Sequence, residues 1–149
     1  MQFQNVSERQ AGEIWHQAMH RALVDSETSY CLNLQPYVGR IGPRPEQSQG
    51  ERVVLELTEY LCGSGCHVTG DNFFTSLPLC QSLLRRNLTY NGTLRQNKAY
   101  LPSEFLPNRQ REAHSSLFGF TETTTIVSYV PKKGRAVNLM STLHKENRQ

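Results

Sequence analysis

Aspartate is rare in this chain, and one of its two copies stands where functional side chains commonly gather. The 149 residues contain Asp25 and Asp71 as the only aspartates. Asp71 follows the short apolar stretch HVTG and precedes NFFTSLPL, which has the pattern of a helix start. In open α/β sheets, functional side chains collect beyond the carboxyl ends of strands. Asp71 therefore has the position of a site residue, although one carboxylate alone does not make a site.

Basic side chains are concentrated in the second half of the chain. Residues 1–74 carry five Lys and Arg against nine Asp and Glu, whereas residues 75–149 carry eleven against four. A basic half can approach a phosphate backbone, because each neutralised phosphate releases counterions. A solvated surface that merely keeps the chain soluble explains the same charge equally well. The candidates that we select for phosphate contact are Arg95, Lys98, Lys132, Lys133 and Arg135.

Length and composition indicate a single soluble domain. A mass of 17.0 kDa suits one ordinary domain. No stretch approaches the roughly 18 apolar residues needed to cross a bilayer, so we expect no membrane association. The amino terminus, MQFQNVSERQAGEIWHQAMHRAL, lacks a basic segment followed by an apolar core. We therefore expect an intracellular protein that is not secreted.

Hydrophobic periodicity predicts alternating strands and helices before residue 98. Ile14, Ala18 and Ala22 recur at helical spacing, which predicts a helix over residues 8–23. SETSYCLNLQPYVGR alternates like a strand, with Pro36 weakening its end or placing it at an edge. The inward positions that we expect in this strand are Tyr30, Leu32, Leu34 and Tyr37.

The clearest helix is ERVVLELTEYLCGSG, in which Gly63 and Gly65 supply the stop. Its expected apolar face consists of Val53, Val54, Leu57, Tyr60 and Leu61. HVTGDNFF then reads as a short strand that ends at Asp71, and Ser76 can cap the following helix. LTYNGTLRQ reads as another strand, in which Gly92 marks a bulge or a close approach.

After Lys98 the pattern becomes β-rich. AYLPSEFLPNRQREAHSS is a proline-bearing connector with room for one helical turn. LFGFT, TTTIVSYVPKK and RAVNLMSTLHK are three strand candidates, the last two joined by a KKGR turn. Alternating strands and helices favour an α/β sheet with parallel pairs.

Several segments, in the correct order, resemble the piggyBac transposase family. GDNFFTSLPLCQSLLRRNLTYNGTLRQNKAYLP is similar to the family's DN-aromatic-FTS-x-PL segment and the GT-x-R-x-N-K segment that follows it. SSLFGFTETTTIVSYVPKKGRAVNLMSTLH is similar to the family's downstream stretch that ends in STLH. The resemblance extends from about Asp25 to His144.

The resemblance implies a DDE-type transposase with an RNase H-like fold, acting on DNA in the nucleus, with a homodimer in the full-length family. In such enzymes, aspartates from separated segments hold Mg²⁺, which activates the attacking oxygen and stabilises the leaving one. By motif, Asp71 matches the second catalytic aspartate. Asp25 does not match a catalytic position.

The other members of the catalytic set have no counterpart in this sequence. The family's first aspartate lies upstream of the SETSY-like stretch, where this chain has no aspartate, and the third lies in a GGVD-like segment that this chain does not contain. Because magnesium sites for phosphoryl transfer normally use two or more carboxylates, we expect weak Mg²⁺ binding and no activity of this chain alone.

We therefore expect an α/β fold: an incomplete RNase H-like domain of strand-helix-strand-helix-strand order, followed by a β-rich insertion segment. The expected divisions are a helical segment outside the family over 1–24, a partial transposase core over 25–97 and a truncated β-rich segment over 98–149.

An alternative function is a domesticated DNA- or protein-binding module that uses the basic half. Phe73 and Phe74 are expected in the core rather than stacked on a base. An exposed sheet edge predicts marginal stability or aggregation.

Overall fold

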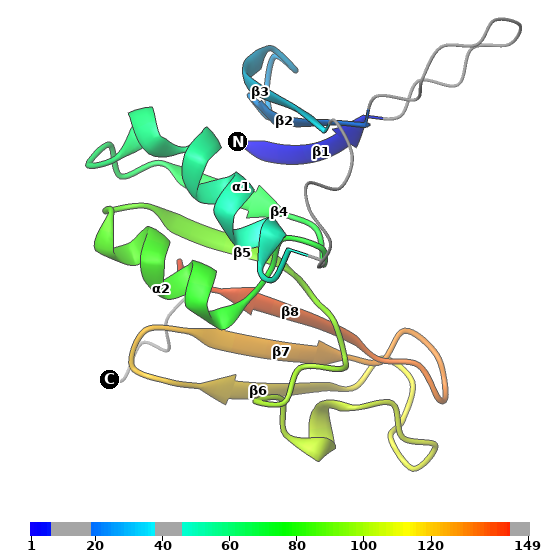
Figure 1. Cartoon of the computed structure of the whole chain (residues 1–149). Helices are drawn as coiled ribbons and strands as arrows, with labels where there is room; N and C mark the ends of the chain where they lie inside the picture. Colours follow the sequence, from blue (N-terminus) through cyan, green and yellow to red (C-terminus); the bar gives the residue numbers. More distant parts are fainter. Residues whose placement is uncertain (7–18, 38–45, 144–149) are drawn as a thin grey trace, which may run out of the picture.

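A computed structural model describes residues 1–6, 19–37 and 46–143, which form one mixed sheet with helices packed on it (Figure 1). The order of strands across this sheet is β3-β2-β1-β4-β5-β8-β7-β6. The strands are β1 (Gln2–Val6), β2 (Met19–Val24), β3 (Cys31–Tyr37), β4 (His67–Gly70), β5 (Thr89–Leu94), β6 (Ser116–Phe120), β7 (Thr125–Tyr129) and β8 (Val137–Ser141). The helices are α1 (Gln49–Leu57) and α2 (Leu77–Arg85), with short 3₁₀ turns η1 (Glu59–Leu61) and η2 (Ser103–Phe105).

The centre of the sheet is parallel and its flanks are antiparallel. β4 pairs in parallel with β1 on one side and with β5 on the other. β2 and β3 extend the sheet antiparallel beyond β1, and β8, β7 and β6 extend it antiparallel beyond β5. This mixed architecture confirms the predicted α/β class and is consistent with a partial RNase H-like fold followed by a β-rich segment.

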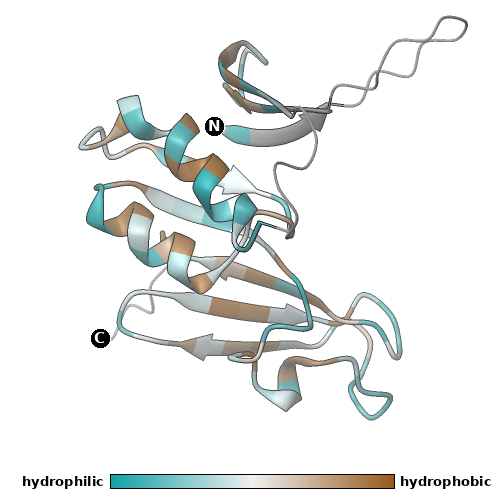
Figure 2. Cartoon of the chain, in the orientation of Figure 1, coloured by the Kyte–Doolittle hydropathy of each residue, from teal (hydrophilic) through white to brown (hydrophobic). Residues whose placement is uncertain are grey.

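The hydrophobic core lies between the sheet and the two helices. α1 and α2 lie side by side over one face of the sheet (Figure 1), and each carries apolar and polar residues on different sides (Figure 2). Fully buried side chains in both helices and in the strands beneath them include Leu23, Val53, Val54, Val68, Leu79, Leu83, Tyr90 and Met140.

Local sequence explains where α2 begins. The Ser76 hydroxyl accepts the Leu79 backbone N–H at 3.2 Å, which satisfies a donor left open at the helix start. Pro78 stands in the first turn, where its missing N–H costs little. The predicted cap and the buried positions Leu79 and Leu83 are therefore confirmed, while Leu84 is only partly buried.

The predicted helix over residues 8–23 is wrong where the structure describes it. Residues 19–23 belong to β2, which pairs with β1 on one side and β3 on the other. Pairing with two neighbouring strands overrode a weak helical spacing, since short apolar patterns suit either state. Residues 7–18, the rest of that prediction, lie outside the described residues.

Two predicted inward faces also need correction. Tyr60 is 54% exposed, because α1 ends at Leu57 and the tighter 3₁₀ turn η1 changes the angular spacing of the residues that follow. In β3, Leu32 packs against the core as predicted, but the amide of Asn33 also faces α1 and donates to the Leu57 carbonyl at 3.1 Å. Leu34 points away and is 49% exposed, and Tyr30 precedes the strand and is 69% exposed.

Candidate nucleic-acid interface

Asp71 comes immediately after β4, at the carboxyl end of the strand, as its sequence context predicts. One carboxylate oxygen, Oδ1, accepts the backbone N–H of Phe73 at 2.8 Å, and the Asp71 carbonyl accepts the Thr75 hydroxyl at 2.8 Å. An aspartate that bonds the backbone two residues onward forms a turn of its own. Asp71 thus shapes the turn that leads from β4 to α2.

Two glycines let β4 and β5 pack closely beneath this turn. A Cβ on Gly92 would meet the Thr75 hydroxyl and the Gly70 carbonyl, and a Cβ on Gly70 would meet the Tyr90 hydroxyl. The Tyr90 hydroxyl lies 2.9 Å from the Thr75 hydroxyl, and burial raises the Tyr90 pKa. The close approach predicted at Gly92 is confirmed, and it fixes the turn that carries Asp71.

Arg95 lies beside Asp71 and Asn72 at the same edge of the sheet. It follows β5 directly, and its Nε donates to the Asn72 side-chain oxygen at 3.2 Å. Its guanidinium carbon lies 5.7 Å from the centre of the Phe73 ring. Because β4 and β5 are parallel neighbours, their carboxyl ends meet here, and the structure brings Arg95 to the Asp71 turn.

Phe73 is not the core residue that the sequence suggested. Phe74 is 1% exposed and belongs to the core, but Phe73 is 36% exposed. Arg21 of β2 lies 5.4 Å from the Phe73 ring centre, and its Nη2 donates to the Gln49 side-chain oxygen at 2.9 Å. Sequence reasoning missed Arg21, since it lies in a segment expected to be helical.

The basic turn between β7 and β8 reaches the same edge. β5 and β8 are antiparallel, so the carboxyl end of β5 lies beside the start of β8, and the Gln96 side-chain amide donates to the Ala136 carbonyl at 2.8 Å. The Arg135 N–H donates to the Lys132 carbonyl at 3.0 Å, which confirms the predicted turn. The exposed residues of this turn are Lys132, Lys133 and Arg135.

A cavity of about 530 Å³ joins the end of β5 to the start of β8. Residues of the Asp71 turn, of β5 and the segment after it, and of β8 line this cavity: Asn72, Thr93, Leu94, Arg95, Gln96, Asn97, Ala136, Val137 and Asn138. Lys98 stands just beyond, where its carbonyl accepts the Leu101 N–H at 3.0 Å. The edge that carries Asp71 is thus polar and basic.

Not every arginine of the basic half is available to a ligand. Arg111 donates from Nη1 to the Ser128 hydroxyl and from Nη2 to the Ser128 carbonyl, both at 2.8 Å, and so ties the connector to β7. Arg86 donates to the Leu55 carbonyl at 2.9 Å and pairs with Glu59 at 2.8 Å. These two side chains have structural partners inside the molecule.

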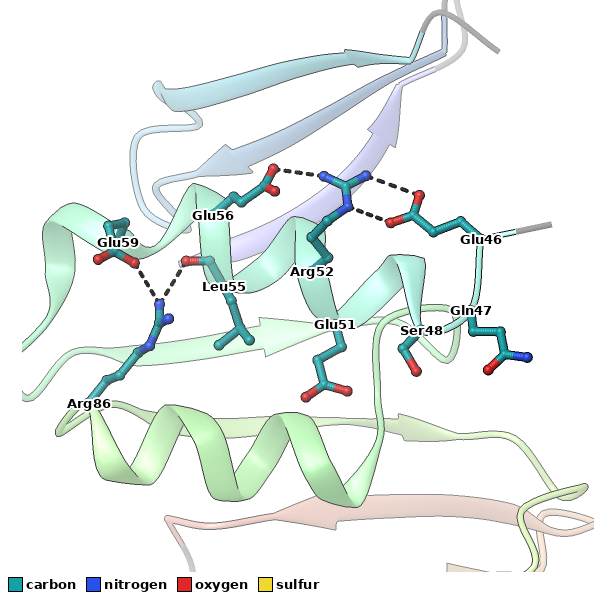
Figure 3. A pocket seen from close by; sticks show the side chains of 9 residues that line it. All are labelled: Glu46, Gln47, Ser48, Glu51, Arg52, Leu55, Glu56, Glu59 and Arg86. Atoms are coloured by element: carbon teal, nitrogen blue, oxygen red, sulfur yellow. Dashed lines mark hydrogen bonds and ion pairs between the residues drawn. The ribbon is translucent and has the colours of Figure 1, made fainter. Parts of the chain in front are cut away.

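The groove beside α1 has the opposite chemistry (Figure 3). Its cavity of about 410 Å³ is lined by four glutamates, Glu46, Glu51, Glu56 and Glu59, together with Arg52 and Arg86. Arg52 pairs with Glu46 and Glu56, and its hydrogen bond to Glu46 lowers the Glu46 pKa. An acidic lining repels phosphate, which leaves the Asp71 edge as the better candidate for a nucleic-acid contact.

The residues around Asp71 do not fit a catalytic Mg²⁺ site. Within residues 1–6, 19–37 and 46–143, no group of three or more His, Cys, Asp or Glu side chains is placed to hold a metal ion. β1, the strand beside β4, has the sequence QFQNV, which contains no carboxylate. Asp25 lies elsewhere, in the turn between β2 and β3. There its carboxylate accepts the Glu27 N–H and the Thr28 hydroxyl, two bonds that lower the Asp25 pKa.

Comparison with protein-family models shows the class of protein to which the chain belongs. A family model described as Transposase IS4 matches residues 8–149, and the chain belongs to this DDE-type transposase family. The match begins upstream of Asp25, where the sequence resemblance was expected to start.

The particular type follows from a solved structure. The chain is similar to the piggyBac transposase in a cryo-electron microscopy structure of a synaptic complex with hairpin DNA, with 36% sequence identity and a TM-score of 0.78. The two findings confirm the predicted piggyBac-type DDE transposase fold. The match covers 89% of this chain and 28% of that transposase. No curated protein matches the chain.

Proposed function

We propose that this chain is a piggyBac-type transposase domain segment that contacts DNA through the Asp71 edge and has no catalytic activity by itself. The observation that carries the proposal is the position of Arg95, which is hydrogen-bonded to Asn72 beside Asp71 and lines one cavity together with Ala136, Val137 and Asn138, the residues that directly follow the basic turn. The similar piggyBac transposase was solved with hairpin DNA, which supports DNA as the partner. Action on DNA implies a nuclear location.

The DNA-contact part of the proposal rests on charge gathered from separate segments. Arg95 and Lys98 follow β5, and Lys132, Lys133 and Arg135 precede β8, so five basic residues from two segments share one edge. Such a surface neutralises phosphates without reading bases. Phe73 carries the guanidinium groups of Arg21 and Arg95 over its ring, and these cation–π contacts help to hold Arg95 at this edge.

The inactive part of the proposal rests on the carboxylates. The family uses divalent metal in general, and Asp71 is the residue of this chain that would contribute to such a site. Among the described residues, Asp71 is not part of any group of three or more His, Cys, Asp or Glu side chains that could hold a metal ion, and its Oδ1 already accepts a backbone N–H. We therefore propose that Mg²⁺ binds poorly here unless further acidic ligands are supplied.

Two assays on the full chain test these parts separately. In the first, a labelled DNA hairpin is incubated with Mg²⁺ and either the wild type or Asp71→Asn. We expect no nicking by either protein. Nicking that requires Mg²⁺ and disappears in Asp71→Asn would contradict the inactive state.

The second assay measures DNA affinity by fluorescence anisotropy. Arg95→Ala should weaken binding about five- to tenfold, since one phosphate contact at moderate salt is lost. Arg85→Ala is the matched control, because it removes the same charge from the last turn of α2, a helix of about 13 Å that runs away from Asp71. Equal effects of the two variants would contradict a localised interface.

The boundaries expected from the sequence, which give the segments 1–24, 25–97 and 98–149, remain part of the proposal, but the first segment is not a helix outside the family, because β1 and β2 pair into the same sheet as β4 and the family match begins at residue 8. A homodimer of the complete family enzyme is also part of the proposal. The alternative function, a domesticated module that binds DNA or protein through its basic half, uses the same edge. It differs in its partner, because an acidic protein surface would compete with DNA for Arg95 and Lys98. A pull-down with and without nuclease treatment distinguishes a protein bound directly from a protein held through DNA.

A further inference from the structure

The two borders of the sheet differ in how they are protected against pairing. β3 forms one border and contains Pro36, which has no N–H to donate, and Gln35 donates to Glu56 of α1 at 2.6 Å. β6 forms the other border, and its sequence SLFGF has neither proline nor charge. Proteins usually guard edge strands with proline, charge or a covering element. The connector covers one face of β6, where the Phe105 ring lies over Gly119. Of the described borders, β6 is thus the one whose edge has neither proline nor charge to prevent pairing.

The hydrogen bonds at the two ends of β6 show which groups point outward. The Val130 N–H donates to the Ser115 carbonyl at 3.0 Å, and the Thr121 N–H donates to the Thr124 carbonyl at 2.8 Å. In an antiparallel pair, hydrogen-bonded and non-bonded positions alternate. Odd-numbered residues thus bond to β7, and the N–H and C=O groups of Ser116, Phe118 and Phe120 point to the open side.

These outward groups are arranged so that β6 can pair with a second copy of itself. An antiparallel pairing centred on Phe118 places Phe118 opposite Phe118 of the second copy, and Ser116 opposite Phe120. Every outward N–H and C=O of the three residues then has a partner. In the same register Leu117 lies opposite Gly119, whose lack of a side chain leaves room for the larger residue.

The side chains favour such a contact. Phe118 is 60% exposed and Phe120 is 46% exposed, and their rings stack 6.2 Å apart at an angle of 6°. By register, Phe118 lies on the same face of the sheet as Val127 and Leu139, and Leu139 and Val137 of β8 are each 42% exposed. The register also brings Glu122, beyond one end of β6, toward His114 beyond the other end, so that no like charges face each other there.

We propose that the β6 edge is a self-association surface, through which two copies of this chain join their sheets by antiparallel pairing of residues 116–120. The contact is isologous, so it closes at a dimer and uses up both open edges. Main-chain hydrogen bonds supply the affinity, and the Phe118 pair at the two-fold axis sets the register. The inference is independent of the proposed DNA contact. The DNA contact involves the start of β8, beside β5, whereas self-association involves β6, the outermost strand on that side of the sheet.

Analytical ultracentrifugation of the full chain tests the proposal. We expect a monomer–dimer equilibrium in the wild type. Phe118→Lys puts two like charges opposite each other, and we expect the dissociation constant to rise at least about tenfold. Phe120→Lys is the matched control: its lysine faces Ser116 of the other copy, so it should dimerise better than Phe118→Lys. Far-UV circular dichroism and thermal melts check that the variants are folded.

A charge-pairing experiment separates the edge contact from unspecific association. Phe118→Lys and Phe118→Glu should each be monomeric, and an equimolar mixture of the two should form a heterodimer. A wild-type monomer at every concentration would overturn the proposal. So would a dimer that is unchanged in Phe118→Lys, or a mixture that stays monomeric. Open-ended aggregates that persist in both variants would also overturn it, since they would place association on the apolar face instead.

Discussion

At the scale of single residues, Asp71 has a role that does not require a metal. Its carboxylate accepts the Phe73 N–H and its carbonyl accepts the Thr75 hydroxyl, so it defines the turn after β4. The position after the strand could be predicted from the sequence, because an apolar run ended there. The bond to the Phe73 N–H could also be anticipated, because an aspartate often bonds the backbone two residues onward and so caps the loop before the next helix. The bond from the Thr75 hydroxyl could not, since it depends on Thr75 being held against Tyr90.

Substitutions at Asp71 separate this turn role from catalysis. Asp71→Ala removes the acceptor of the Phe73 N–H and should lower the free energy of unfolding by about 1 kcal/mol. Asp71→Asn keeps an oxygen acceptor and should cost less than about 0.5 kcal/mol. Urea unfolding followed by circular dichroism measures both. Equal losses for the two variants would show that the negative charge, not the hydrogen bond, is what the turn needs.

The buried thiol of Cys80 and the buried hydroxyl of Tyr90 predict how the free energy of unfolding changes with pH. Burial raises the pKa of the Cys80 thiol from 9.0 to about 12, and burial also raises the Tyr90 pKa. The unfolded chain therefore loses these protons first as the pH rises. The stability from the neutral forms is complete below about pH 9 and declines between about pH 9 and 12. We expect the urea midpoint to fall from pH 8 to pH 10, and to fall less in Cys80→Ala. A midpoint that rises with pH would contradict this.

At the scale of elements, the sequence predicted those whose pattern is local and strong. Helix α2 with its Ser76 cap, strands β4 to β8 and the turn before β8 all follow from spacing and turn residues. β2 was misread as a helix because its strand character comes from pairing with β1 and β3. The inward position Leu32 in β3 is confirmed, but Leu34 was wrong, because Asn33 bonds to α1 and no local pattern reports that contact.

The packing of β4 against β5 gives a prediction at this scale. Gly92→Ala would force a methyl group into the Thr75 hydroxyl and the Gly70 carbonyl, and should cost roughly 2 to 3 kcal/mol. Gly63→Ala has free space for its Cβ but a φ of +82°, and should cost about 1 kcal/mol from backbone strain. Thermal and urea unfolding compare the two. A smaller loss at Gly92 would mean that β4 and β5 separate easily.

At the scale of the whole molecule, the acidic, basic and apolar surfaces lie in different places. Acidic side chains line the groove beside α1, basic ones gather at the Asp71 edge, and the open apolar strand is β6. In the described part of the chain, no helix is long and apolar enough to cross a membrane. The basic residues could be selected from the sequence as candidates. Their meeting at one edge could not, because it follows from the antiparallel pairing of β5 with β8. The expected tendency to aggregate remains a prediction, and β6 is the strand on which it would depend.

The measurement that tests the central claim most directly is the salt dependence of DNA affinity for the wild type, Arg95→Ala and Arg85→Ala. If Arg95 contacts a phosphate, the logarithm of the wild-type affinity falls linearly with the logarithm of salt concentration, and Arg95→Ala lowers that slope by about 0.9. Arg85→Ala should leave the slope unchanged. An affinity that does not fall as salt rises, or equal slopes for the wild type and Arg95→Ala, would contradict a DNA interface at the Asp71 edge.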